Sequence, residues 1–142
     1  MKAISIKEHG DINVINYGNI NDPEVKKNQL LVKVEAAAIN HLDIWVRKGL
    51  PNMTLPLPLI LGSDGSGTII EKNGNIGQYS IGDKVVIQPG TFNLNCDKVL
   101  DGNENFSSSY GILGETQNGV QSEYVALNIE NVYPKPSHLS FI

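Results

Sequence analysis

The chain has 142 residues, which suits one domain, and a domain of this size buries roughly two-thirds of its unfolded surface without disulfides or metals. It carries 11 Lys and Arg against 15 Asp and Glu, a formal net charge of −4, and its basic residues form no cluster. Nucleic acid and anionic membrane surfaces are therefore excluded as expected partners.

The sequence predicts neither a membrane span nor a secretory signal. The longest apolar stretch, residues 55–61, contains Pro56 and Pro58 and is shorter than the roughly 18 residues that a span needs. The first residues lack the apolar core of a signal peptide, and the single cysteine, Cys96, cannot form an internal disulfide. We therefore expect a cytoplasmic protein.

Several segments have the pattern of β-strands. Residues 2–7 and 30–34 alternate apolar and polar side chains, which predicts half-buried strands, and the Gly, Asn, Asp and Pro of residues 18–23 predict a loop between them. Further strands are expected at residues 67–71, 83–88 and 121–127. This spacing favours a mainly β fold, an antiparallel barrel or sandwich.

One short helix is predicted over residues 39–48, where apolar side chains recur at helical spacing. Asn40 can cap its N-terminus, and Gly49 ends it. We expect Trp45 to pack in the core rather than to form a platform for a substrate.

The turns and the helix carry short sequence blocks in a fixed order. The blocks are 34–40 (VEAAAIN), Asp43, 47–49 (RKG), 57–58 (LP), 62–67 (GSDGSG), 82–85 (GDKV) and 119–125 (GVQSEYV). Together they resemble the N-terminal half of the medium-chain dehydrogenase/reductase superfamily, which includes zinc-type alcohol dehydrogenases and quinone oxidoreductases. The resemblance covers nearly the whole chain and implies a GroES-like distorted β-barrel over residues 1–142, with one or two short helices.

The resemblance also implies a Rossmann domain that would begin just beyond residues 136–140 and is absent from this chain. Residues 62–67 depart from the G-x-G-x-x-G spacing and lead into a strand rather than a helix, so we interpret them as a barrel turn. The implied cofactor is NADPH or NADH, held by the chain's own Rossmann domain. A homo-oligomeric full-length protein and inactivity of this domain alone are further expectations.

The position of the family's catalytic zinc is altered. Where zinc-dependent members have a cysteine and a histidine as ligands, this chain has Asn40 and Ser63, and Leu42 replaces the hydroxyl that relays the alcohol proton. A carboxamide is a weak, neutral substitute for a thiolate. We therefore expect no catalytic zinc. These positions resemble the zinc-free branch of the family, which reduces a carbonyl-conjugated double bond or a quinone.

The resemblance places four candidate catalytic residues in the cleft: Asn40, Asp43, Ser63 and Asp64. Asn40 could donate a hydrogen bond to the developing oxyanion, and His41 could bind a cofactor phosphate. Asp43 and Asp64 could be general acids, although carboxylates in such positions are more often structural acceptors. The alternative is that Asn40 only caps the helix and that His41 is solvated.

Residues 91–110 resemble a degenerate structural-zinc lobe. The family's C-x₂-C-x₂-C-x₇-C frame falls on Asn93, Cys96, Val99 and Ser107, so one of four thiolate positions is kept. A tetrahedral structural site depends on the full ligand set, and we expect no metal here.

Two functions remain open from the sequence. The first is the substrate-side domain of a nicotinamide-dependent oxidoreductase that acts on a small-molecule carbonyl, quinone or enone. The second is a non-catalytic GroES-like binding or interaction module. The chain ends on the apolar run of residues 139–142, which favours a truncated enzyme. A Rossmann unit or a stop codon after Ile142 would discriminate between them.

Overall fold

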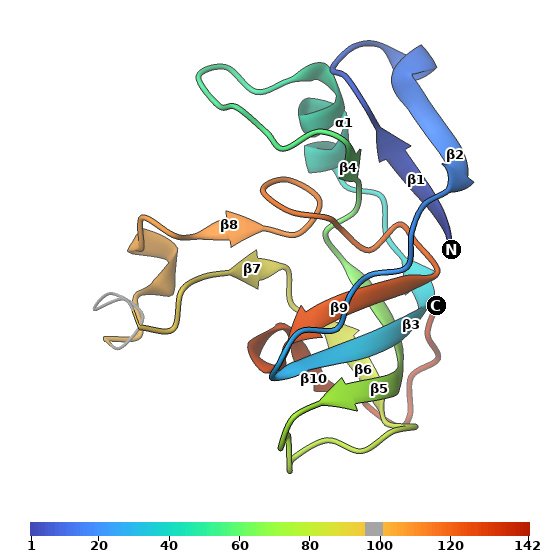
Figure 1. The fold of residues 1–142 in the computed structure, drawn as a ribbon, viewed down its shortest axis with the longest axis vertical. Coiled ribbons are helices and arrows are strands. Elements are labelled where there is room, and N and C mark those ends of the chain that lie inside the picture. The colour runs from blue at the N-terminus through green and yellow to red at the C-terminus, as the bar shows by residue number, and fades with distance from the viewer. Residues whose placement is uncertain (96–100) are drawn as a thin grey trace.

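The computed structural model describes residues 1–95 and 101–142, which form two antiparallel sheets and a separate two-stranded ribbon (Figure 1). The strands are β1 (Lys2–Ile6), β2 (Ile15–Asn19), β3 (Gln29–Ala37), β4 (Leu59–Ile60), β5 (Gly65–Asn73), β6 (Lys84–Ile87), β7 (Gly90–Thr91), β8 (Gly111–Ile112), β9 (Tyr124–Asn128) and β10 (Val132–Pro134). The helices are α1 (His41–Lys48) and three short 3₁₀ turns, η1 (Ile12–Val14), η2 (Glu104–Phe106) and η3 (Ile129–Asn131).

The larger sheet has the strand order β10-β6-β5-β3-β9, and its buried face forms the main core. Leu30 and Val32 of β3 are fully buried and alternate with less buried neighbours, which confirms the strand predicted at residues 30–34. They pack with Ile69 of β5 and Val85 of β6. Burial of each such side chain stabilises the fold by roughly 1.5–3 kcal/mol.

The smaller sheet, β2-β1-β4, lies with α1 at the opposite end of the molecule from the large sheet (Figure 1). Ile6, Val46 and Leu59 form a second core between β1, α1 and β4. The exposed Ile15 and Tyr17 of β2 contribute nothing to it. This strand was not predicted, because pairing with β1 rather than burial of an apolar face holds it.

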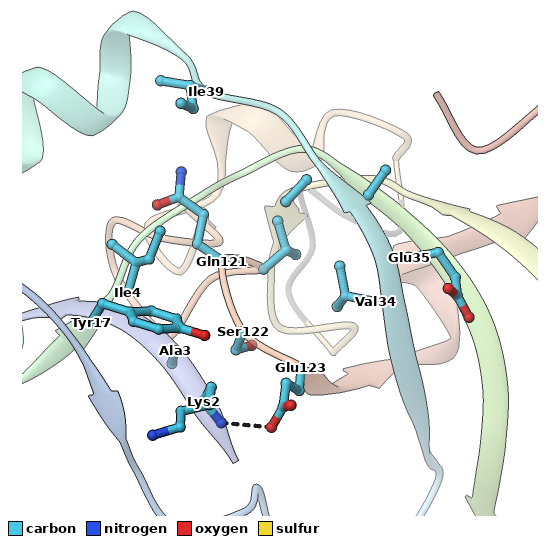
Figure 2. Close-up of a pocket in the computed structure, with 13 residues that line it drawn as sticks. Lys2, Ala3, Ile4, Tyr17, Val34, Glu35, Ile39, Gln121, Ser122 and Glu123 are labelled. Carbon is cyan, nitrogen blue, oxygen red and sulfur yellow. Dashed lines mark hydrogen bonds between the residues drawn. The ribbon is translucent and has the colours of Figure 1, made fainter.

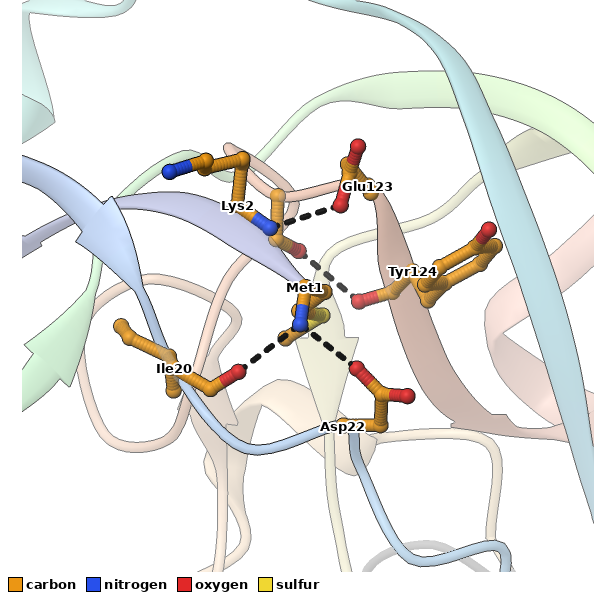
Figure 3. Close-up of polar contacts among 7 residues, drawn as sticks. Met1, Lys2, Ile20, Asp22, Glu123 and Tyr124 are labelled. Atoms are coloured by element: carbon orange, nitrogen blue, oxygen red, sulfur yellow. Dashed lines mark hydrogen bonds and ion pairs between the residues drawn. The ribbon is translucent and has the colours of Figure 1, made fainter.

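The N-terminal residues join the two sheets, as Figure 3 shows. Lys2 donates its backbone N–H to the carboxylate of Glu123 at 2.6 Å, and Ala3 bridges Ser122. The Met1 ammonium donates to the carbonyl of Ile20 at 2.9 Å and to Asp22 at 2.7 Å. Hydrogen bonds therefore hold the start of β1 both to the segment before β9 and to the segment after β2.

The helix α1 begins at His41 rather than at the predicted residue 39. Asn40 is the N-cap and has an extended backbone (φ −112°, ψ 159°), so the helical dihedrals begin one residue later. The predicted end at Gly49 is confirmed, with φ +91°. The prediction that Trp45 packs in the core is wrong: the side chain is 52% exposed, because Val46 faces the core.

The strand predicted at residues 121–127 begins only at Tyr124. Before it, Gln121 donates its N–H to the carbonyl of Leu61 and accepts from the N–H of Ile4, so this stretch crosses between sheets. Residues 92–95 and 101–110 are mostly irregular, and β7 pairs with β8 to form a ribbon that projects to the left in Figure 1. Within the described parts of the chain, no helix is long and apolar enough to span a bilayer.

Candidate functional site

Asp43, in the first turn of α1, is a buried carboxylate that binds three separate segments. Its Oδ2 accepts the backbone N–H of Asn40 at 2.8 Å and the side-chain Nε2–H of Gln121 at 3.3 Å. Its Oδ1 accepts the backbone N–H of Gly62 at 3.0 Å. The side chain is only 6% exposed, and hydrogen bonds of this kind offset the cost of burying a charge.

Asn40 and Asp64 are joined by a side-chain hydrogen bond. The Nδ2 of Asn40 donates to Oδ2 of Asp64 at 2.6 Å, so the amide group is directed toward the turn that follows β4, while Asn40 and Asp43 form a capping box at the start of α1. Asp64 is exposed and Asn40 is half-buried. The second amide N–H of Asn40 remains available to a ligand.

Ser63 lies in the turn between Gly62, which donates to Asp43, and Asp64, which accepts from Asn40. It is 5% exposed. Its Oγ is buried and has no hydrogen-bond partner, the one such side-chain atom within the described residues. Gly62 before it has φ +94°, and an added Cβ would lie 2.5 Å from Cγ of Gln121. Only glycine therefore fits at residue 62.

His41 lies outside this hydrogen-bonded group. It is exposed on the first turn of α1, where its ring contacts Trp45 with centroids 4.8 Å apart and planes tilted by 58°. The structure thus brings Asn40, Asp43 and Asp64 into one network, and leaves the imidazole of His41 accessible at its edge.

Two long-range contacts were not predicted from the sequence, one within the site and one in the last turn of α1. Gln121 contacts Asp43 from 78 positions away, and Arg47 is a buried guanidinium whose Nη1 donates to the carbonyl of Gly10 at 2.7 Å and lies 3.4 Å from Asp11. Both residues stand within the blocks that carry the resemblance. Their contacts were not visible in the sequence because they depend on distant backbone.

In the lobe, two described positions of the zinc frame are joined through Ser109. The backbone N–H of Asn93 donates to Oγ of Ser109 at 3.0 Å, and Oγ of Ser107 and Oγ of Ser109 are 2.7 Å apart. The predictions for Cys96 and Val99 lie outside the described residues. Over residues 1–95 and 101–142, no three His, Cys, Asp or Glu side chains gather as a metal site.

The comparisons with known proteins identify the family. The alcohol dehydrogenase GroES-like domain family matches residues 26–137, and this chain belongs to it, as the N-terminal domain type of the medium-chain dehydrogenase/reductases. The crystal structure of an NAD-dependent alcohol dehydrogenase superposes with a TM-score of 0.94 and 40% identity, over 99% of this chain and 41% of that chain. The predicted GroES-like fold is confirmed.

Two relatives come from eukaryotes. A zinc-type alcohol dehydrogenase-like protein of Schizosaccharomyces pombe is 34% identical over 119 residues, which are 83% of this chain and 32% of that protein. A 2-methylene-furan-3-one reductase of Solanum lycopersicum is 32% identical over 143 residues, covering 99% of this chain and 32% of the reductase. The chain therefore spans about a third of the length of these relatives.

Replacement of Asp43 by Asn tests the central carboxylate. The substitution removes the charge and turns an amide N–H₂ group toward backbone donors, so we expect a loss of about 1–3 kcal/mol in the free energy of unfolding. The measurement is urea denaturation of both proteins. The same change at exposed Asp64 should cost about 0.5 kcal/mol or less, and equal losses at both positions would contradict the assignment.

Glu115 gives the stability a pH dependence. Desolvation by partial burial raises the pKa of the Glu115 carboxyl above its ordinary value, so the ionised form destabilises the folded state. Its stabilising contribution is complete below the unfolded pKa of about 4.3 and is lost as the pH rises through the folded pKa. Glu115→Gln should therefore raise Tm at pH 7 but not at pH 3.5, whereas Glu71→Gln, at an exposed position, should change Tm little at either pH.

Proposed function

We propose that this chain is the substrate-side domain of a nicotinamide-dependent oxidoreductase whose Rossmann domain follows Ile142. The observation that carries the proposal is the Asn40–Asp43–Asp64 network, built at the turn and helix where this family places its reacting centre. The length of the relatives supports a second domain, since this chain corresponds to about 40% of the NAD-dependent alcohol dehydrogenase. Without that domain the chain would bind no dinucleotide productively.

The chemistry of the network favours reduction of a quinone or enone without catalytic zinc. The two positions that supply a thiolate and an imidazole in zinc-dependent members are here a carboxamide, already bonded to Asp64, and the neutral hydroxyl of Ser63. A neutral carboxamide and a neutral hydroxyl are weak ligands that do not fit a catalytic zinc. A nicotinamide, when bound, supplies hydride to a carbon that is already activated by conjugation to a carbonyl.

The chain's own residues would orient the acceptor and stabilise charge. The remaining N–H of Asn40 donates to the substrate oxygen as negative charge develops there, and Asp64 holds the carboxamide in place. Ser63 has an O–H donor that no described residue engages, and we assign it to the same polar group. Asp43 is buried and bonded three times, so we assign it a structural role rather than proton transfer.

The exposed imidazole of His41 is proposed to contact a phosphate of NADPH or NADH. Its position beside Asn40 and its lack of a hydrogen-bonded partner among the described residues support this assignment. The proposed partners are a small-molecule quinone or enone, the chain's own Rossmann domain and further copies of the full-length protein, in the cytoplasm.

The activity is tested with the full-length polypeptide. It should oxidise NADPH in the presence of quinones or enones, and 1,10-phenanthroline should not affect the rate. Asn40→Ala should lower kcat by about 100-fold, the effect of removing one donor to an oxyanion, whereas Asn16→Ala on the exposed β2 should not. Oxidation of a simple alcohol that chelation abolishes would identify a zinc-dependent alcohol dehydrogenase instead.

We further propose that residues 91–110 hold no structural zinc. Hydrogen bonds through Ser109 join Asn93 and Ser107, the two frame positions that the structure describes, and neither side chain is a thiolate. A structural zinc site draws its binding energy from a complete set of four ligands.

The zinc content tests this proposal directly. After dialysis the chain should retain far less than one equivalent of zinc in elemental analysis. The combined substitutions Asn93→Cys, Val99→Cys and Ser107→Cys complete the frame around Cys96 and should bring about one equivalent of bound zinc. Addition of Cys96→Ser to that variant should abolish the gain, and stoichiometric zinc in the unaltered chain would refute the proposal.

A further inference from the structure

Gln121 lies in the connection that joins the ribbon to β9, and its backbone is fixed on both sides. Its N–H donates to the carbonyl of Leu61 at 2.9 Å, and its carbonyl accepts the N–H of Ile4 at 2.8 Å. The side chain extends from this anchored position toward Ile39, as Figure 2 shows. These two hydrogen bonds fix the point from which the side chain starts.

The side chain of Gln121 passes over Gly62 and ends at Asp43. Its Cγ occupies the space that a Cβ on Gly62 would need, with a separation of 2.5 Å. Its Nε2 donates to Oδ2 of Asp43 at 3.3 Å, and the same oxygen accepts the backbone N–H of Asn40 at 2.8 Å. One carboxylate oxygen therefore receives both donors.

We infer that Gln121 is a positioning residue for Asn40, acting through the shared Oδ2 of Asp43. Gly62 and Asn40 each donate to one oxygen of the Asp43 carboxylate, and the donor from Gln121 adds a third restraint that helps to fix the carboxylate plane. With that plane fixed, the N–H of Asn40 has one acceptor position, and the carboxamide of Asn40 is directed to Asp64. The catalytic importance of this effect rests on the proposed function. The hydrogen bonds among Gln121, Asp43 and Asn40 are independent of it.

A simple packing role for Gln121 would have different consequences. Its methylene groups line a groove of about 380 Å³ together with Ile4, Tyr17 and Ile39. Leucine has nearly the same volume and would fill that wall as well as glutamine does. Leucine cannot donate to Asp43, so the substitution separates packing from hydrogen bonding.

The first test compares Gln121→Leu with the unaltered chain by ¹⁵N NMR. We expect the backbone and side-chain amide signals of Asn40 to shift, and exchange of the Asn40 backbone amide hydrogen to accelerate by about three- to tenfold, as the loss of one hydrogen bond predicts. Signals of core residues such as Leu127 should stay in place. Gln117→Leu, at an exposed position, is the matched control and should leave Asn40 unchanged.

The second variant, Gln121→Glu, keeps the shape and covers the case in which the leucine protein fails to fold. A protonated glutamic acid donates to Asp43 as glutamine does, so the Asn40 signals should match the unaltered chain at low pH. As the pH rises, two facing carboxylates cannot both ionise freely, and the Asn40 signals should shift. Other titratable groups nearby are Lys2, Tyr17, Glu35 and Glu123 in the groove wall, and Asp64 and His41 beside Asn40.

Unchanged Asn40 signals in Gln121→Leu, or in Gln121→Glu across the titration, would overturn the inference. In the full-length polypeptide, Gln121→Leu should lower kcat about three- to tenfold while KM for the nicotinamide cofactor stays constant. If the unaltered full-length protein reduces no enone or quinone, the proposed function fails, whereas the NMR comparison still decides the role of Gln121.

Discussion

The arrangement of this domain's polar site depends on the hydrogen bonds that the buried carboxylate of Asp43 accepts. The carboxylate joins the start of α1, the turn after β4 and the connection before β9, three segments that belong to different parts of the chain. A charge with so little exposure is tolerated only when hydrogen-bond donors surround it. The donors are mainly backbone groups, so the carboxylate specifies the path of the chain as well as the position of Asn40.

The two sheets provide the rigid frame for this contact. The fully buried Leu30 and Val32 fix β3, whose end leads directly into Asn40, and β1 holds Gln121 through Ile4. Gly62 allows the turn and the Gln121 side chain to approach closely. The site is thus formed where a helix, a glycine turn and a crossing segment meet, and an error in any one of them would separate its polar groups.

Much of the fold was predictable because local patterns and burial agree. The alternation of apolar and polar side chains predicted β3 and β6, and Gly49 predicted the end of α1. The prediction failed where local pattern and environment disagree. In β2 the apolar side chains remain exposed, and Trp45 lies one position away from the face that Val46 buries. Helical spacing identifies an apolar face only to within about one residue, because neighbouring positions are about 100° apart.

The sequence by itself determined which chemical groups occupy the four candidate site positions: a carboxamide at residue 40, a hydroxyl at residue 63 and carboxylates at residues 43 and 64. It also determined the family, since the blocks occur in order along the chain. Only the tertiary structure decided that Asp43 accepts hydrogen bonds from Gly62 and from Gln121, 19 and 78 positions away. The physical reason is that a hydrogen bond requires donor and acceptor within about 3 Å, and the folded backbone path sets that distance.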